Sequence, residues 1–117
     1  MIRQATIDDV KEFFSERGLS APDELTCNMM VVDNGLLVSY ATLDEFTCEV
    51  HICAKRKALK HVKELIGVAE HFLQFQGFEK LYTAIKPEFP TAIKLAERAG
   101  FKQLGCYNDH IVFGKEL

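Results

Sequence analysis

The chain has 117 residues and a net charge of −3, and 48% of its residues are hydrophobic while 26% are charged. This length suits one domain, and the composition is typical of a folded globular protein rather than a disordered chain. The excess of acidic residues argues against general nucleic-acid binding. No apolar run approaches the roughly 20 residues of a membrane-spanning helix, and the N-terminus lacks a secretory signal. We therefore expect one domain over residues 1–117 that works in the cytoplasm, away from membranes.

The cysteines and histidines give no metal-binding pattern. There is no CxxC pair among the four cysteines and no HxxxH spacing among the four histidines. Three of the cysteines lie in strand-like apolar runs, where a thiol behaves as a small hydrophobic group. We predict reduced, buried thiols and no metal site.

The first half of the chain is predicted to form a strand, a helix and a three-stranded meander. Thr6 is a suitable N-cap, and Gly18 is a suitable end for the helix that Thr6 begins. Asn34-Gly35 is a two-residue turn whose positive φ angles suit a tight hairpin. The predicted strands of this half cover residues 2–5, 27–33, 36–43 and 46–53.

The third strand of this meander carries two ionisable groups on one face. Residues 46–53 alternate strictly between apolar and other side chains. Because successive side chains of a strand point to opposite faces, Glu49 and His51 share a face.

The second half is predicted to begin with a long helix. From Ala58 to Phe75 the apolar residues recur at helical spacing, and Gly77 ends the helix. Pro90 suits the first turn of a later helix that ends at Gly100, and Asn108-Asp109 joins the last two strands. The remaining predicted strands are 81–85, 101–107 and 110–115. A meander followed by a strand-helix-strand crossover gives a mixed sheet covered by helices.

Two segments of the sequence carry a family resemblance. The opening IRQATIDDV and the later AIKLAERAGF, spaced around a meander and one long helix, resemble the GCN5-related N-acetyltransferase (GNAT) family over nearly the whole chain. The resemblance implies an α/β (α+β) fold with a mixed, mostly antiparallel central sheet flanked by helices. The compact size and a basic loop are similar to acetyltransferase-like proteins encoded by bacteriophages.

The resemblance also implies where acetyl-CoA, the co-substrate, would bind. In the family it lies in a V-shaped gap between the third meander strand and the strand after the long helix. Backbone groups near His51, Ile52 and Cys53 would then bind the pantetheine arm. The pyrophosphate would sit at the N-terminus of the long helix, where unpaired amides favour anions.

The loop before the long helix departs from the family pattern. Family members enter this helix through Arg/Gln-x-x-Gly-x-Gly/Ala, but residues 54–62 contain no glycine. Five positive charges between Lys55 and Lys63 offer side-chain contacts to phosphate instead. The alternatives are a solvated helix face and a docking site for an acidic partner. The predicted cofactor-binding residues are His51, Ile52, Cys53, Lys55, Arg56, Lys57, Lys60, His61 and Val62.

The later helix also departs from the pattern. Many family members carry Asn near its start and, in its second turn, a Tyr that protonates the departing thiolate. Counting back from Gly100, Phe89 and Ala96 occupy these positions. Ala96 has no proton to donate.

Glu49 is the predicted general base, because the resemblance places it on the meander strand from which some family members project a catalytic Glu. Burial beside the cleft would raise its pKa. His51 lies two residues further along the same face and can relay the proton, since its reference pKa is about 6.5. Tyr107 or Tyr82 would supply the acid. The alternative is that these groups face solvent on a half-exposed sheet. Cys53 has no neighbouring catalytic pattern that would make it an acyl-carrying nucleophile.

These observations leave three functions open. The first is an acetyl-CoA-dependent N-acetyltransferase acting on a primary amine, either a protein lysine or N-terminus or a small amine. The second is a catalytically silent GNAT-like module that binds or inhibits another protein, for example a phage component acting on host machinery. The third is a nucleic-acid-binding module built on the basic helix, which lacks an aromatic platform beside the lysines.

Overall fold

The computed structural model describes residues 1–117, and its elements follow the predicted order. The strands are β1 (Ile2–Gln4), β2 (Asn28–Val32), β3 (Leu36–Asp44), β4 (Thr47–Ala54), β5 (Lys80–Ile85), β6 (Lys102–Tyr107) and β7 (His110–Glu116). The helices are α1 (Ile7–Glu16), α2 (Val62–Phe75), α3 (Pro90–Arg98) and a short 3₁₀ helix at Arg56–His61.

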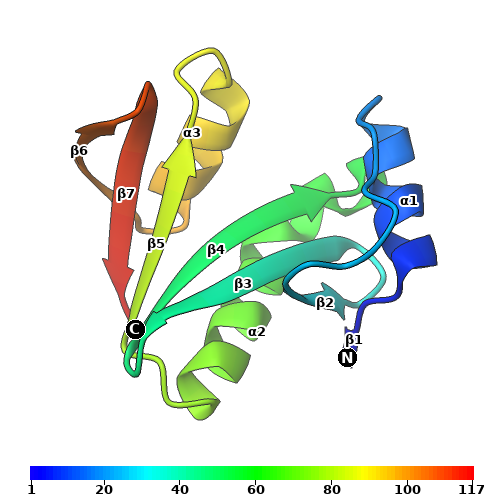
Figure 1. Ribbon diagram of the computed structural model, residues 1–117, viewed down its shortest axis with the longest axis horizontal. Helices are drawn as coiled ribbons and strands as arrows, with labels where there is room; N and C mark the ends of the chain where they lie inside the picture. The colour runs from blue at the N-terminus through cyan, green and yellow to red at the C-terminus, as the bar shows by residue number, and fades with distance from the viewer.

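The strands form one seven-stranded sheet in the order β1-β2-β3-β4-β5-β7-β6 (Figure 1). Only β4 and β5 are parallel, and every other neighbouring pair is antiparallel. The predicted mixed, mostly antiparallel sheet flanked by helices is therefore confirmed.

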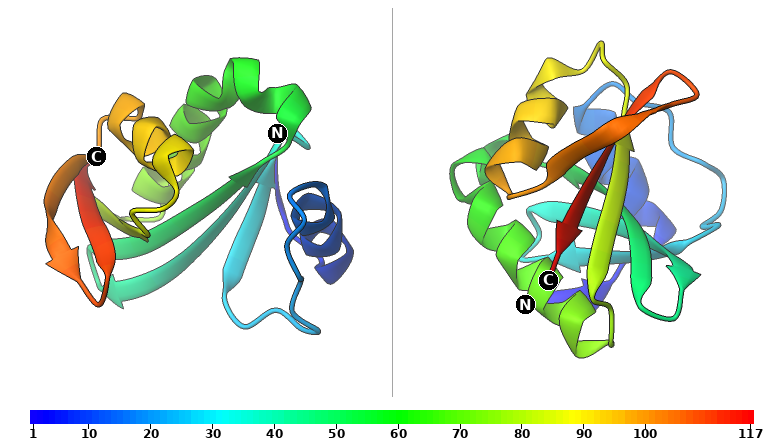
Figure 2. Two further views of the ribbon diagram at one scale, coloured as in Figure 1. Left: turned by 90° about the horizontal axis from the view of Figure 1, so that it is seen from above. Right: turned by 90° about the vertical axis from the view of Figure 1, so that its left-hand side faces the viewer.

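The helices cover both faces of this sheet, with α2 and α3 on one side and α1 on the other (Figure 2). Leu65 and Leu73 of α2 pack with Cys48 and Val50 of β4 in the larger core. Val10 and Phe13 of α1 form a smaller core with residues of β2 and β3. Because alternate residues of β4 face opposite sides, Glu49 and His51 lie on the α1 side of the sheet.

Local signals explain the ends of α1. Thr6 accepts a hydrogen bond from the Asp9 amide, and the Asp9 carboxylate accepts one from the Thr6 amide, which completes a capping box. Gly18, with φ of 69°, follows the helix. The predicted helix start and stop are confirmed.

The first hairpin turn differs from the prediction in one respect. The positive φ angles belong to Asp33 and Asn34, not to Asn34 and Gly35. Gly35 is needed for space, because a Cβ added there would lie 2.7 Å from the Cβ of Ala58. The glycine thus lets the 3₁₀ helix approach the hairpin closely.

The long helix starts later than predicted. The α-helix begins at Val62, and Arg56–His61 forms a 3₁₀ helix before it. No side chain caps either start. The contact of Ala58 with Gly35 ties this turn to the hairpin, and 3₁₀ geometry is common at such helix ends.

The cysteines are free thiols, but two of them are not buried. Cys27 precedes β2 and Cys106 lies on the edge strand β6, and both are exposed. The prediction of buried thiols is wrong for these two residues, because Cys27 lies outside the sheet and Cys106 lies on an edge strand whose side chains are in solvent.

Candidate functional site

The parallel strands β4 and β5 are joined at one end only. They pair from Thr47 to Glu49 on β4 and from Lys80 to Tyr82 on β5. Beyond this point β5 stays paired with β7, whereas β4 runs on to Ala54 with a partner only on its β3 side. Figure 1 shows the two strands separating from the end near the C-terminus. The result is the wedge-shaped gap that the sequence predicted.

The register of β3 and β4 decides which backbone groups face this gap. The Lys55 amide donates to the Gly35 carbonyl at 2.9 Å, so the backbone N–H of Lys55 points toward β3. Alternate residues of an antiparallel strand point their N–H and C=O groups to opposite edges. The backbone groups of Cys53 and His51 therefore also point toward β3. The N–H and C=O of Ile52 point into the gap. Of the three residues predicted to bind pantetheine, only Ile52 offers its backbone groups there.

Past Ile52, the next carbonyl at this edge already has a partner. Arg17 donates from Nε and Nη2 to the Ala54 oxygen at 3.0 and 2.7 Å. Arg17 directly follows α1, so the end of that helix reaches the open edge of β4.

The predicted catalytic residues line one cavity beside this gap. The cavity has a volume of about 380 Å³ and brings together β4, β5, β7 and the β6–β7 turn. Its lining includes Glu49, His51 and Tyr107, which the sequence singled out. The other lining residues are Ala84, Asn108, His110 and Val112.

Glu49 and His51 contact each other in this cavity. His51 Nε2 lies 2.7 Å from Glu49 Oε2. A carboxylate only accepts hydrogen bonds, so Nε2 carries a proton and the lone pair of neutral His51 is on Nδ1. The side chain of Glu49 is 44% exposed and that of His51 is 50% exposed, so the burial expected for Glu49 is not found.

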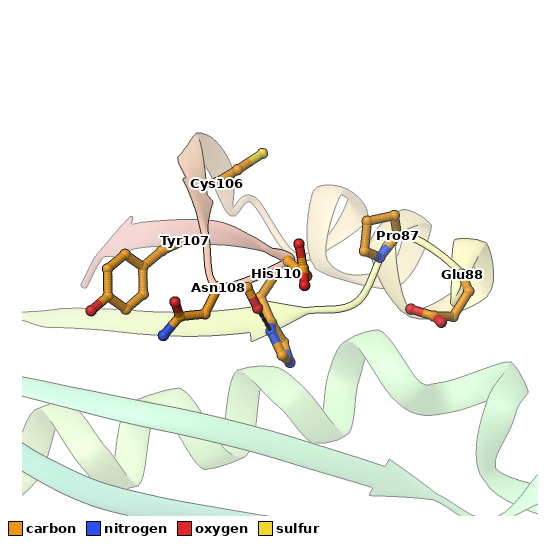
Figure 3. Close-up of a pocket in the computed structure, with 7 residues that line it drawn as sticks. Pro87, Glu88, Cys106, Tyr107, Asn108 and His110 are labelled. Atoms are coloured by element: carbon orange, nitrogen blue, oxygen red, sulfur yellow. Dashed lines mark hydrogen bonds between the residues drawn. The ribbon is translucent and has the colours of Figure 1, made fainter.

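His110 is a cavity residue to which the sequence reasoning gave no role. Its Nδ1 lies 2.7 Å from the Asn108 carbonyl oxygen. Figure 3 shows this bond, and the Tyr107 ring and the Cys106 side chain point away from His110. A polar residue directly after the Asn108-Asp109 turn was the available signal, but the position of that turn depends on the sheet.

The other predicted proton donors and nucleophiles lie differently. Tyr107 is 73% exposed, and Tyr82 is half-buried, with its ring near Gly114. The Cys53 thiol points toward the Phe13 carbonyl of α1, and burial raises the pKa of this thiol. A raised pKa leaves less thiolate, the nucleophilic form, which argues against Cys53 as an acyl carrier.

The basic cluster is partly neutralised by α1. Lys55 is buried, pairs with Glu12 and lies 4.9 Å from the centroid of the Phe13 ring. The Arg56 amide donates to Glu16 at 2.5 Å. Carboxylates therefore occupy the first polar groups at the predicted phosphate position. Lys57, Lys60 and His61 are exposed, and Val62 is half-buried.

Solved structures share this architecture. A putative phosphinothricin N-acetyltransferase superposes with a TM-score of 0.75 at 17% identity, covering 100% of this chain and 98% of its own. The ribosomal-protein-S5-alanine acetyltransferase of Vibrio fischeri gives 0.70 at 14% identity, covering 98% and 91%. A GNAT superfamily phosphinothricin acetyltransferase of Sinorhizobium meliloti, in complex with AcCoA, gives 0.67 at 15% identity, covering 100% and 88%.

The chain has the GNAT fold. No family model matches the sequence, and no curated protein is significantly similar to it. At these identities the likeness concerns the fold alone.

The position at which the family resemblance implies a tyrosine is occupied by Ala96 of α3. Ala96 is buried in the larger core, and Phe89 at the start of α3 is 55% exposed. No helix of the chain combines the length and apolarity that a membrane span requires.

Proposed function

We propose that the protein is an acetyl-CoA-dependent N-acetyltransferase acting on a primary amine. The observation that carries this proposal is the separation of β4 and β5 after Glu49 and Tyr82, beside a cavity lined by Glu49, His51 and Tyr107. The AcCoA complex of a structural neighbour with the same fold supports acetyl-CoA as the co-substrate.

The gap fits a pantetheine arm. Ile52 offers an N–H and a C=O at the open edge of β4, and the amides of pantetheine can pair with both groups as a neighbouring strand would. The phosphates would contact the exposed side chains of Arg56, Lys57 and Lys60. Lys55 and the Arg56 amide become available only if Glu12 and Glu16 give way.

The cavity supplies the groups for acyl transfer. The amine nitrogen bonds to the thioester carbonyl carbon, the carbon–sulfur bond breaks, and the sulfur leaves as a thiolate. His51 Nδ1 takes a proton from the nitrogen, while Glu49 holds the ring by its Nε2. Tyr107 is the proposed donor to the thiolate. Glu49 thus orients His51, which refines the expected roles of base and relay.

The acceptor that we propose is a protein amine, either a lysine or an N-terminus. The cavity is at the surface, and its turn residues Tyr107 and Asn108 are exposed, so an extended peptide can reach it. The V. fischeri neighbour is named for an alanine of ribosomal protein S5. An amine at the end of a flexible side chain or chain end fits such an open site.

Calorimetric titration with acetyl-CoA and free CoA tests the first step. We expect binding that weakens in Arg56→Ala and Lys57→Ala, followed by turnover on a panel of lysine and N-terminal peptides. Absence of heat at millimolar acetyl-CoA from a folded protein would contradict the enzyme assignment.

One observation favours a second candidate, a catalytically silent GNAT-fold module that binds another protein. Glu12 and Glu16 already pair with Lys55 and the Arg56 amide, so part of the predicted phosphate position is satisfied without a ligand. The same titration separates the candidates, because this module predicts either no binding or binding without turnover on every peptide.

A further inference from the structure

The backbone holds His110 firmly at the junction of two cavities. It is the first residue of β7, it pairs with Tyr107 across the hairpin, and it is partly buried. The turn before it has φ of 48° at Asn108 and 62° at Asp109, which is the geometry of a tight two-residue hairpin. Such a turn leaves the following side chain little freedom of position.

The hydrogen bond of His110 fixes which ring nitrogen can accept a proton. The Asn108 carbonyl oxygen can only accept, so Nδ1 at 2.7 Å must carry the hydrogen. In neutral His110 the lone pair is therefore on Nε2. A backbone partner that sets the tautomer in this way is typical of histidines that move protons.

The two cavities share three residues. The larger cavity, of about 710 Å³, lies between the β6–β7 turn and the loop from β5 to α3 (Figure 3). Tyr107, Asn108 and His110 line both this cavity and the smaller one that contains Glu49 and His51. His110 is the only imidazole that borders both spaces.

We propose that His110 is a further catalytic residue, which takes the first proton from the acceptor ammonium as the acceptor enters through the larger cavity. This inference rests on the proposed acetyltransferase function.

The reaction removes two protons from the acceptor nitrogen, and the two cavities offer one imidazole for each, His110 and His51. An ammonium loses two protons when it becomes an amide, and one proton ends on the thiol while the other goes to solvent. His110 Nε2 receives the first and passes it outward, because the larger cavity lies on the surface. His51 Nδ1 receives the second as the carbon–nitrogen bond forms.

The ionisable groups around His110 favour this role. Two carboxylates, Glu88 and Asp109, line the larger cavity together with His110 and give its entrance a negative charge that attracts an ammonium. The full set of titratable groups that line the two cavities with His110 is Glu49, His51, Glu88, Cys106, Tyr107 and Asp109.

The test compares His110→Asn with His71→Asn. An asparagine amide at position 110 can still donate toward the Asn108 carbonyl but lacks the Nε2 acceptor, whereas His71 is exposed on α2 and lines neither cavity. We expect kcat/KM for the amine acceptor near pH 7 to fall about 100-fold in the first variant only. The defect should shrink as the pH rises toward the pKa of the amine, and added imidazole should restore part of the rate.

Binding and nitrogen shifts provide readouts that do not depend on turnover. Affinity for acetyl-CoA by calorimetry should be unchanged in His110→Asn. In the wild type, ¹⁵N shifts should show Nδ1–H His110 at high pH and should move when a lysine peptide is added with free CoA. His110→Gln provides a second variant should the asparagine protein not fold.

The outcomes separate this inference from the function on which it rests. Wild-type protein that neither binds acetyl-CoA nor acetylates any amine would overturn both. An active wild type whose position 110 variants keep full rate at every pH, or whose His110 shifts ignore the peptide, would overturn only the role of His110.

Discussion

The two ends of strand β4 present opposite situations. Toward its N-terminal end, Glu49 and His51 face a cavity, and their hydrogen bond leaves a proton-accepting nitrogen free. At its C-terminal end, two of the groups expected to bind phosphate, Lys55 and the Arg56 amide, are already paired with Glu12 and Glu16 of α1. The end for which we propose proton transfer keeps a free acceptor, whereas the predicted phosphate end is partly paired within the protein itself.

This difference teaches that the two halves of a GNAT-like site can change independently. A phosphate site built on glycine amides needs no side chains, because the backbone approaches the ligand directly. This chain lacks those glycines and carries basic side chains at the same place, where carboxylates of a neighbouring helix pair with Lys55 and the Arg56 amide. Substitutions at the proton-transfer end should therefore change rate, and substitutions at the phosphate end should change affinity.

The largest effect is expected at the proton-transfer end. His51→Asn removes the free ring nitrogen and should lower kcat by about 10²- to 10⁴-fold. Glu49→Gln keeps a hydrogen-bond acceptor but loses its charge, so its rate should fall less. Calorimetry should give wild-type affinity for acetyl-CoA in both variants. An unchanged pH–rate profile in both would remove this pair from the reaction.

A smaller effect is expected at the point where the gap opens. Ile52→Pro removes the N–H that points into the gap. It removes no hydrogen bond to β3, because the backbone groups of Ile52 point away from that strand. Loss of one hydrogen bond of about 1 kcal/mol should weaken acetyl-CoA binding roughly fivefold to tenfold. Ile52→Val keeps the N–H and is the matched control. Equal affinities for the two variants would show that the pantetheine arm does not use this edge.

At the phosphate end we expect a gain rather than a loss. Glu16→Gln removes the negative charge that lies beside the Arg56 amide. Binding of acetyl-CoA should tighten by about fivefold, or roughly 1 kcal/mol. Acetyl-pantetheine lacks the phosphates and provides the control, because its affinity should not change. If both ligands respond alike, Glu16 acts on the shape of the gap rather than on the charge of the ligand.

Local sequence signals predicted the elements of the fold and the shared strand face of Glu49 and His51. The Thr6 cap, the Pro90 helix start and the alternation around Glu49 and His51 each depend on neighbours in the sequence, so one chain is enough to recognise them. The family resemblance supplied the gap between β4 and β5.

The rest depends on contacts between distant residues. Glu16 meets the Arg56 amide across a separation of 40 residues. That contact is set by how α1 packs on the sheet. The isolation of Ile52 at the gap depends on the β3–β4 register, and His110 reaches the cavity because β7 lies beside β5. No local pattern contains this information.

The smallest expected effect concerns the helix that creates the difference between the two ends. Arg3 donates to both Asp9 oxygens, at 2.6 and 2.7 Å, and this pairing holds the pKa of Asp9 well below its usual range. A carboxyl whose pKa is lowered by folding stabilises the protein above its unfolded pKa of about 4, and this contribution is lost as the pH falls further.

The free energy of unfolding should therefore decrease between about pH 5 and pH 2. Asp9→Asn keeps a side-chain cap for α1 but removes the charge, so its urea midpoint should depend less on pH than that of the wild type over this interval. The unfolding of α1 should also release Glu16 and Glu12, which lie in the same helix. Parallel pH dependence in the wild type and the variant would show that Arg3 and Asp9 do not anchor the helix. The position of Glu12 and Glu16 at the phosphate end would then have to depend on Arg17 and its bond to Ala54.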